Sequence, residues 1–184
     1  TVILSQAFVG NYDLVPASST GDSMDDSSTI WTLTNDPTLS TSEPWVQVHD
    51  GASGRWSIPD HGAPTDQRLV SPPLQVSTTG NFGFTMRHRY SMEADSSNFY
   101  DGTVIEITTD DGKTWTDIGT SLTSNGYGGA LWALNDVLPG RQAFVGTSKG
   151  YPNYLTTTAD LGTAYQGKTV KLRFRLGTDP AVGG

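Results

Sequence analysis

The feature that most constrains this fold is how frequently glycine and proline interrupt the chain. The sequence contains 21 Gly and 10 Pro in 184 residues, and no stretch of eleven residues keeps apolar side chains at the spacing of a helix face. Segments in which apolar and polar residues alternate are frequent instead. Because successive side chains of a strand point to opposite faces of a sheet, this alternation predicts an all-β protein.

Two long segments show the alternation most clearly. In residues 81–93 the side chains on one face are Phe82, Phe84, Met86, His88, Tyr90 and Met92. In residues 168–176 apolar side chains alternate with Lys171, Arg173 and Arg175. Each pattern predicts an antiparallel strand with one face buried and the other polar.

Shorter segments supply further strands. Residues 102–109 are strand-like, and the Asp-Gly turn at 110–113 returns the chain into residues 114–118, which predicts a hairpin. Pro72 and Pro73 mark a corner before another short strand. The remaining strand candidates are residues 30–33, 45–49, 74–76 and 142–146, and the two long loops are expected at 13–28 and 120–140.

Turn residues at this spacing are typical of an all-β sandwich. The length fits one core, and no break in composition divides the chain, so we expect a single β-sandwich domain over residues 1–184. The alternation assigns eight side chains to its interior: Phe84, Met86, Tyr90, Ile105, Ile107, Trp115, Leu172 and Phe174.

Charge and composition exclude several classes of function. Acidic residues outnumber basic ones by 19 to 11, so nucleic acid and anionic lipid are not expected as partners. No apolar run approaches the roughly 20 residues that span a bilayer, which predicts no membrane insertion. The absence of cysteine excludes disulfides, a thiolate nucleophile and cysteine-ligated metals. An acidic composition rich in Ser, Thr, Asp and Gly is compatible with a bacterial secreted or surface protein.

Motifs for catalysis are weak. The three histidines, His49, His61 and His88, occur in no His-Glu-x-x-His pair, which disfavours a zinc hydrolase. His88 lies on an apolar face, where a hydrogen-bonded core histidine is favoured over a catalytic one. Glu106 lies on a strand and is a generic candidate for a pair of glycosidase carboxylates. No Gly-x-Ser-x-Gly elbow marks a nucleophile, although a Ser-His-Asp arrangement formed by folding stays open.

Two groups of residues are candidates for binding. Glu93, Asp95 and Asp101 provide hard oxygen ligands of the kind that Ca²⁺ requires, at the end of a long strand and in the loop after it. The alternative is that these acids only keep the loop hydrophilic. Aromatic residues in Gly-rich or Pro-flanked segments either stack on sugar rings or pack in the core; they are Trp56, Tyr127, Trp132, Tyr151 and Tyr154.

An ordered series of short blocks carries a resemblance to a known family. The blocks are residues 70–74, 88–93, 100–107, 111–115, 140–146, 160–162 and 170–179. Over roughly residues 45–184 the chain resembles the MAM-like jelly-roll module attached to bacterial secreted metallopeptidases of the immune inhibitor A and fungalysin-like groups. The resemblance implies an antiparallel two-sheet jelly-roll β-sandwich, with a structural cation, that acts outside the cell as a non-catalytic appendage.

The resemblance also bears on the cation and on the end of the chain. Glu93 and Asp101 match acidic positions of the family pattern, and Asp50 and Asp95 join them by proximity in sequence alone. Modules of this kind continue with a Gly-Trp-x-x-Asp-Asp-like strand, whereas this sequence stops at residues 181–184. We therefore expect that the last strand is missing or replaced; its loss would leave an unpaired edge, as in a piece of a larger protein.

Two interpretations of function follow. In the first, the chain is a secreted, non-catalytic accessory module that supports or targets an attached enzyme or surface protein by binding an extracellular protein or glycan. In the second, it is a carbohydrate-binding module or adhesin head in which loop aromatics and Ca²⁺ form the ligand site. An independent hydrolase has the least support, and the fold alone does not choose between the first two.

Overall fold

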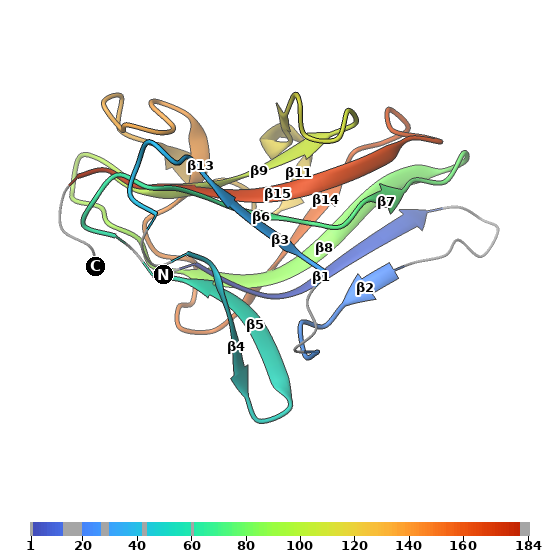
Figure 1. Cartoon of the computed structure of the whole chain (residues 1–184), viewed down its shortest axis with the longest axis horizontal. Helices are drawn as coiled ribbons and strands as arrows, with labels where there is room; N and C mark the ends of the chain where they lie inside the picture. The colour runs from blue at the N-terminus through green and yellow to red at the C-terminus, as the bar shows by residue number, and fades with distance from the viewer. Residues whose placement is uncertain (1, 13–19, 27–29, 42–43, 60, 181–184) are drawn as a thin grey trace.

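The computed structural model describes residues 2–12, 20–26, 30–41, 44–59 and 61–180. Their regular structure consists of antiparallel strands arranged in two sheets that lie face to face, as Figure 1 shows. The two long consecutive strands of the middle of the chain, residues 81–90 and 102–108, lie in different sheets, so the connection between them crosses the sandwich. The all-β, two-sheet jelly-roll sandwich expected from the sequence is confirmed.

The first sheet has seven strands in the order β11-β14-β8-β1-β5-β4, with β2 paired to β1. Its strands are β1 (Val2–Tyr12), β2 (Thr20–Asp22), β4 (Val46–Asp50), β5 (Ser53–Ile58), β8 (Asn81–Tyr90), β11 (Leu122–Ser124) and β14 (Leu155–Asp160). The β4–β5 hairpin projects away from the rest of the sandwich at the bottom of Figure 1.

The second sheet has eight strands in the order β12-β13-β9-β15-β6-β3, with β10 paired to β9 and β7 to β15. Its strands are β3 (Thr32–Asn35), β6 (Asp66–Val70), β7 (Leu74–Gln75), β9 (Gly102–Thr108), β10 (Thr116–Asp117), β12 (Gly129–Ala130), β13 (Gln142–Val145) and β15 (Thr169–Gly177). A short 3₁₀ turn, η1 (Gly119–Ser121), follows β10. Among the residues described, no helix has the length and apolar character needed to cross a bilayer.

Each strand predicted from the sequence has a counterpart in the structure, whereas β1, β2, β5, β6 and β14 were not predicted. Segments 81–93, 102–109, 142–146, 168–176, 45–49 and 74–76 correspond to β8, β9, β13, β15, β4 and β7 within a few residues, and the strand expected at 30–33 begins two residues later as β3. The 110–113 turn is confirmed, with positive φ at Asp111 and Gly112. The loop expected at 120–140 also contains β11 and β12. Of the loop expected at 13–28, residues 13–19 and 27–28 lie outside the described residues, and the described part between them contains β2.

The core lies between the two sheets. It contains seven of the eight predicted side chains: Phe84, Met86, Tyr90, Ile105, Ile107, Leu172 and Phe174. Trp115 was wrongly assigned to the core, because it is half-buried on the outer face of the second sheet. Asp117 pairs with Glu106 of β9, and Trp115, two residues earlier, therefore shares the outer face with Glu106.

A second, smaller apolar cluster covers one end of that outer face. The segment between β12 and β13 folds back over β9 and β13, and the buried members are Val104, Leu131, Leu138, Ala143 and Val145. In Figure 1 this segment is the orange loop above the second sheet. The outer face of β6 and β15, next to the cluster, carries charged side chains.

Candidate functional site

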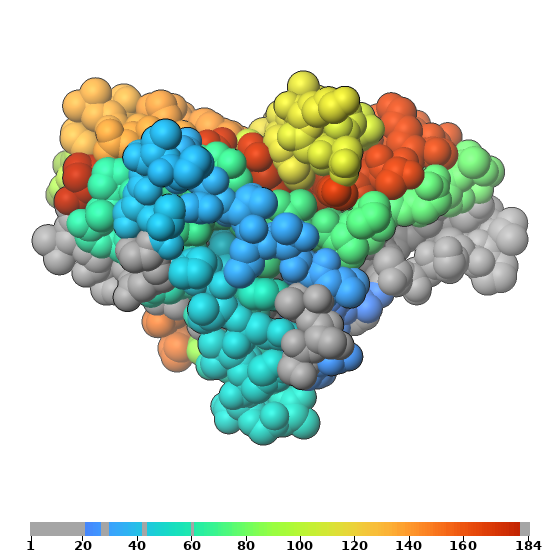
Figure 2. Space-filling model, viewed as in Figure 1, coloured from blue at the N-terminus to red at the C-terminus, as the bar shows by residue number. Residues whose placement is uncertain are grey.

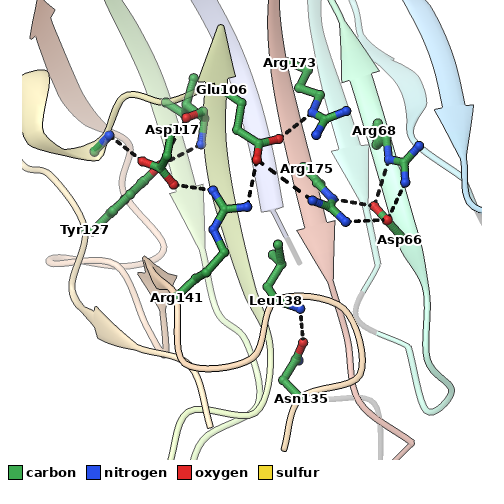
Figure 3. Close-up of polar contacts among 12 residues, drawn as sticks. Asp66, Arg68, Glu106, Asp117, Tyr127, Asn135, Leu138, Arg141, Arg173 and Arg175 are labelled. Atoms are coloured by element: carbon green, nitrogen blue, oxygen red, sulfur yellow. Dashed lines mark hydrogen bonds and ion pairs between the residues drawn. The ribbon is translucent and has the colours of Figure 1, made fainter. Parts of the chain in front are cut away.

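Charged side chains gather on the outer face of the second sheet, across β9, β15 and β6. Arg173 of β15 lies opposite Glu106 of β9, and Arg175 lies opposite Arg68 of β6. Side chains directly opposite each other on one sheet face are about 5 Å apart at Cβ, so the register brings these groups into contact. Figure 3 shows the resulting row of guanidinium and carboxylate groups, which we call the arginine–carboxylate network: Asp66, Arg68, Glu106, Asp117, Arg141, Arg173 and Arg175.

Asp66 is held by two arginines. Arg175 donates from Nε to Oδ1 at 2.8 Å and from Nη2 to Oδ2 at 2.7 Å. Arg68 donates to the same two oxygens, at 3.0 and 2.5 Å. Burial opposes the ionisation of Asp66, but the hydrogen bonds from both arginines outweigh it and lower the pKa of this carboxyl below its ordinary value.

Glu106 has a similar environment. Its Oε1 accepts a hydrogen bond from Nη1 of Arg141 at 2.7 Å, and its Oε2 accepts one from Nε of Arg173. Burial raises the pKa of Glu106, but the two arginines more than compensate, so the pKa is lowered. A glycosidase general acid requires a raised pKa, so this environment suits a structural carboxylate and not a proton donor.

The network presents positive charge to the solvent. Four guanidinium groups face the carboxylates of Asp66, Glu106 and Asp117, which leaves one positive charge in excess. The side chains of Asp66 and Glu106 are 2% and 4% exposed, whereas the four arginine side chains are between 12% and 29% exposed. The two buried carboxylates lie beneath the arginines, so a molecule that approaches Asp66 or Glu106 meets guanidinium groups first, whereas Asp117, beside Arg141, is itself 35% exposed.

His88 lies inside the sandwich, as predicted. It is 2% exposed, its Nε2 is 2.8 Å from Oγ1 of Thr157, and its ring packs edge-on against Phe144. Burial lowers the pKa of His88 to about 4. A buried, neutral histidine with a hydrogen-bonded ring nitrogen is the core histidine that the apolar strand face predicts. His61 is also buried, whereas His49 is exposed on β4.

The four cation candidates lie in different surroundings. Asp101 is fully buried, and its Oδ1 accepts a hydrogen bond at 2.9 Å from the backbone N–H of Asp179, which is also buried. Glu93 is half-buried and precedes the same loop. Asp50 is exposed at the end of β4, on the projecting hairpin. Within the part of the chain that the structure describes, no three His, Asp or Glu side chains form a group suited to a metal ion.

Asp95 organises its own loop. Its Oδ1 accepts hydrogen bonds from the backbone N–H groups of Ser97 and Asn98 at 2.6 and 2.7 Å, and its Oδ2 accepts one from the hydroxyl of Tyr100 at 2.8 Å. These bonds lower the pKa of Asp95. Both carboxylate oxygens therefore have a structural use that spacing in the sequence does not reveal.

The five predicted sugar-binding aromatics do not form one surface. Trp56 lies on β5 and is 3% exposed, so of the two alternatives for this residue the structure shows packing in the core. Tyr127 and Trp132 are half-buried and pack edge-on against Phe144 and Tyr100, respectively. The remaining two share the loop between β13 and β14: Tyr151 is 44% exposed, and Tyr154 lies under the guanidinium groups of Arg87 and Arg89.

Sequence analysis identified only part of the network. The alternation in β15 predicted that Arg173 and Arg175 share the polar face, and Glu106 was noted as a strand carboxylate. Asp66 was missed, because residues 66–70 were not predicted to form a strand and an acidic residue outside a predicted strand is usually solvated. The signal that would have pointed to it is Asp-x-Arg at 66–68, which places both side chains on one face of a strand.

Comparisons with family models, curated proteins and solved structures find no match to this chain.

Proposed function

We propose that this chain is a non-catalytic accessory module that works outside the cell, where it supports or targets an attached enzyme or surface protein by binding an extracellular protein or glycan. The observation that carries the proposal is the outer face of the second sheet. There, the arginine–carboxylate network places fixed guanidinium groups on rigid strands and presents them to the solvent. Side chains held on strands by paired charges form a pre-organised binding surface.

The two residues best suited to acid–base catalysis support the same proposal. His88 is buried between the sheets and held neutral, and Glu106 is held ionised by Arg141 and Arg173. General acid–base catalysis needs a group whose pKa lies near the working pH and that reaches the substrate. Both residues have instead a clear role in holding the sandwich together. The resemblance to MAM-like modules is consistent with this role.

A second candidate function is that of a free-standing carbohydrate-binding module or adhesin head. The observation that favours it is the loop between β13 and β14, where Tyr151 is 44% exposed and Tyr154 stacks beneath two arginines. Aromatic rings beside arginines provide both an apolar face and hydrogen-bond donors for a sugar.

The test is an assay of the purified chain for turnover and for binding. We expect no hydrolysis of peptide or glycoside substrates, and we expect binding on a glycan array or to a partner protein. Turnover that disappears in His88→Ala or Glu106→Gln would contradict the non-catalytic function. Sugar binding that a chelator abolishes would favour the second candidate function, because in that hypothesis Ca²⁺ forms part of the ligand site.

A further inference from the structure

A groove of about 420 Å³ lies on the outer face of the second sheet next to the arginine–carboxylate network and shares Arg68 and Arg173 with it. Its floor is formed by outward-facing residues of β3, β6 and β15, and the hairpin after β9 forms one wall. In Figure 2 this hairpin belongs to the yellow mass; the orange segment before β13, on the other side of the hollow, contributes no lining residue. The lining side chains that matter for binding are Thr32, Thr34, Arg68, Trp115, Lys171 and Arg173.

The groove is cationic although the chain as a whole has a net charge of -8. Arg68, Lys171 and Arg173 line it, and Asp111 is the one acidic residue among the described residues of the lining. Each of the three cations is paired with a carboxylate, of Asp66, Asp111 and Glu106, respectively. The carboxylates that pair with Arg68 and Arg173 lie buried beneath the face, whereas Asp111 is 80% exposed at the rim, where it pairs with Lys171. A ligand with a negative charge is therefore favoured over a neutral or positive one.

Trp115 provides a fixed apolar wall. Its Nε1 donates to the carbonyl oxygen of Gly112 at 3.0 Å, and the guanidinium carbon of Arg173 lies 4.3 Å from its ring centroid. At Gly112 φ is +91°, a conformation that other residues rarely adopt, so the turn requires glycine; a Cβ there would make ordinary van der Waals contact with the indole, at 3.4 Å. The indole is thus held in place before any ligand arrives, which lowers the entropy cost of stacking a ring on it.

The floor of the groove favours a saccharide over a peptide. The exposed residues Thr32 and Thr34 of β3 provide hydroxyl groups that donate and accept hydrogen bonds. The backbone groups of β6 and β15 are paired with neighbouring strands on both sides. An extended peptide therefore cannot pair with β6 or β15 as an additional strand, which is the usual way in which a sheet binds a peptide; among the floor strands, only the outer edge of β3, the last strand of the described sheet, is open to such pairing.

We infer that this groove binds an acidic saccharide of the uronate type. The apolar face of a pyranose ring stacks on Trp115, and the ring carboxylate is held by Lys171 and Arg68. This inference rests on the proposed binding function and adds to it the site and the chemical class of the ligand. It also gives a role to Trp115 outside the core.

The test compares tri-galacturonate with its methyl ester by calorimetry on the whole chain. The ester keeps the rings and removes the charge, so we expect it to bind at least about fivefold more weakly. Lys171→Gln should weaken galacturonate binding about threefold, and Trp115→Leu about tenfold or more. Lys149→Gln, which removes an exposed lysine outside the groove, is the matched control and should bind as the native chain does. Raising the ionic strength from about 0.05 M to about 0.5 M should weaken binding of the acid and not of the ester.

Melting temperatures that stay close to that of the native chain establish that each variant is folded. Equal binding of acid and ester, no binding of either, or equal losses in Lys171→Gln and Lys149→Gln would overturn the inference. Tighter binding of a polyglutamate peptide than of tri-galacturonate would also overturn it, since the partner would then be an acidic protein. These failures differ from failure of the proposed function, which would appear as release of new reducing ends from the saccharide.

Discussion

At the scale of the residue, the most informative side chains are those whose ionisation the fold controls. Asp66 and Glu106 are almost completely buried yet remain charged, because each accepts hydrogen bonds from two arginines. A buried ion pair adds little net stability over a well-packed apolar pair, but removal of one partner is costly. The network therefore specifies the positions of β6, β9 and β15 relative to one another more than it adds stability.

His88 leads to a prediction about pH. Folding lowers the pKa of this histidine from 6.5 to about 4, so the unfolded chain binds the proton more tightly. Its contribution to stability is complete above pH 6.5 and is lost as the pH falls from 6.5 toward 4. Between pH 7 and pH 4.5 we expect the free energy of unfolding to fall by about 2 to 3 kcal/mol from this group alone, as measured by urea denaturation.

The His88→Gln variant should lose this part of the pH dependence, since glutamine does not titrate. His49→Gln is the matched control, because His49 is exposed on β4 and its replacement should leave the pH dependence unchanged. An equally steep fall in stability between pH 7 and pH 4.5 in His88→Gln would show that other groups are responsible.

Individual residues also show where prediction from the sequence succeeds and fails. The position of His88 was predictable, because the alternation of a ten-residue strand assigns each side chain to a face without ambiguity. Trp115 was assigned wrongly, and for Trp56 the sequence did not decide between the core and a binding surface. Trp115 follows a tight turn and precedes a strand of only two residues. Such a short strand has no alternation that assigns a side chain to one face, so the core assignment rested on the hydrophobicity of tryptophan alone. Trp56 has glycine and serine around it, which suggested a loop although it lies on a strand.

At the scale of the element, long strands with regular alternation of apolar and polar residues were predictable. Strands whose own sequence lacks this alternation, and which form by pairing with a distant strand, were not. β8, β9 and β15 carry their own signal, and the Asp-Gly turn gives the hairpin that follows β9. β14 has a threonine-rich sequence, and its apolar alternation is too short to distinguish it from a loop. It is a strand because it pairs with β8 over six residues, and this pairing joins parts of the chain that are distant in sequence.

The central strand β15 gives a prediction about stability. Phe174 is 3% exposed in the main core, and its ring lies 6.0 Å from that of Trp31. The variant Phe174→Ala should lower the free energy of unfolding by about 3 to 5 kcal/mol, because it loses buried apolar contact and leaves a cavity. Leu33→Ala is the control on the edge strand β3, where the side chain is 42% exposed, and it should cost less than about 1 kcal/mol. Equal denaturation midpoints for the two variants would contradict the assigned core.

At the scale of the whole molecule, the two faces of the second sheet have different roles. The inner face packs against the first sheet to form the core, and the outer face is divided between the small apolar cluster and the arginine–carboxylate network. The sequence predicted the two sheets, but not that the segment before β13 covers part of one of them. That coverage depends on Leu131 and Leu138 reaching Val104, which lies far away in sequence. The expected loss of a last strand concerns residues 181–184, which lie outside the described residues.

The predicted cation concerns the whole molecule, because two buried acids, Asp101 and Asp179, connect strands that are distant in sequence. Asp101 lies just before β9 and Asp179 just after β15, and the backbone N–H of Asp179 donates to Asp101. Both residues are buried, at 0% and 2% exposed. If the carboxylates of Glu93 and Asp101 converge, they repel each other, and a hard divalent ion would relieve that repulsion in the folded state alone. Binding of Ca²⁺ near Asp101 and Glu93 therefore stays a prediction that stability measurements test.

If the chain binds Ca²⁺ there, a chelator should lower its melting temperature. Ligand at about 100 times its dissociation constant adds about 2.7 kcal/mol, which for a chain of this size corresponds to roughly 5 to 10 °C. The double variant Glu93→Gln, Asp101→Asn keeps the size of both side chains and should respond much less to the chelator. Asp50→Asn removes an exposed acid on the projecting β4–β5 hairpin and should respond as fully as the native chain. A melting curve that the chelator leaves unchanged, with no metal found by elemental analysis, would assign Asp101 a purely structural role: its hydrogen bond with Asp179 would then join the ends of β9 and β15 without an ion.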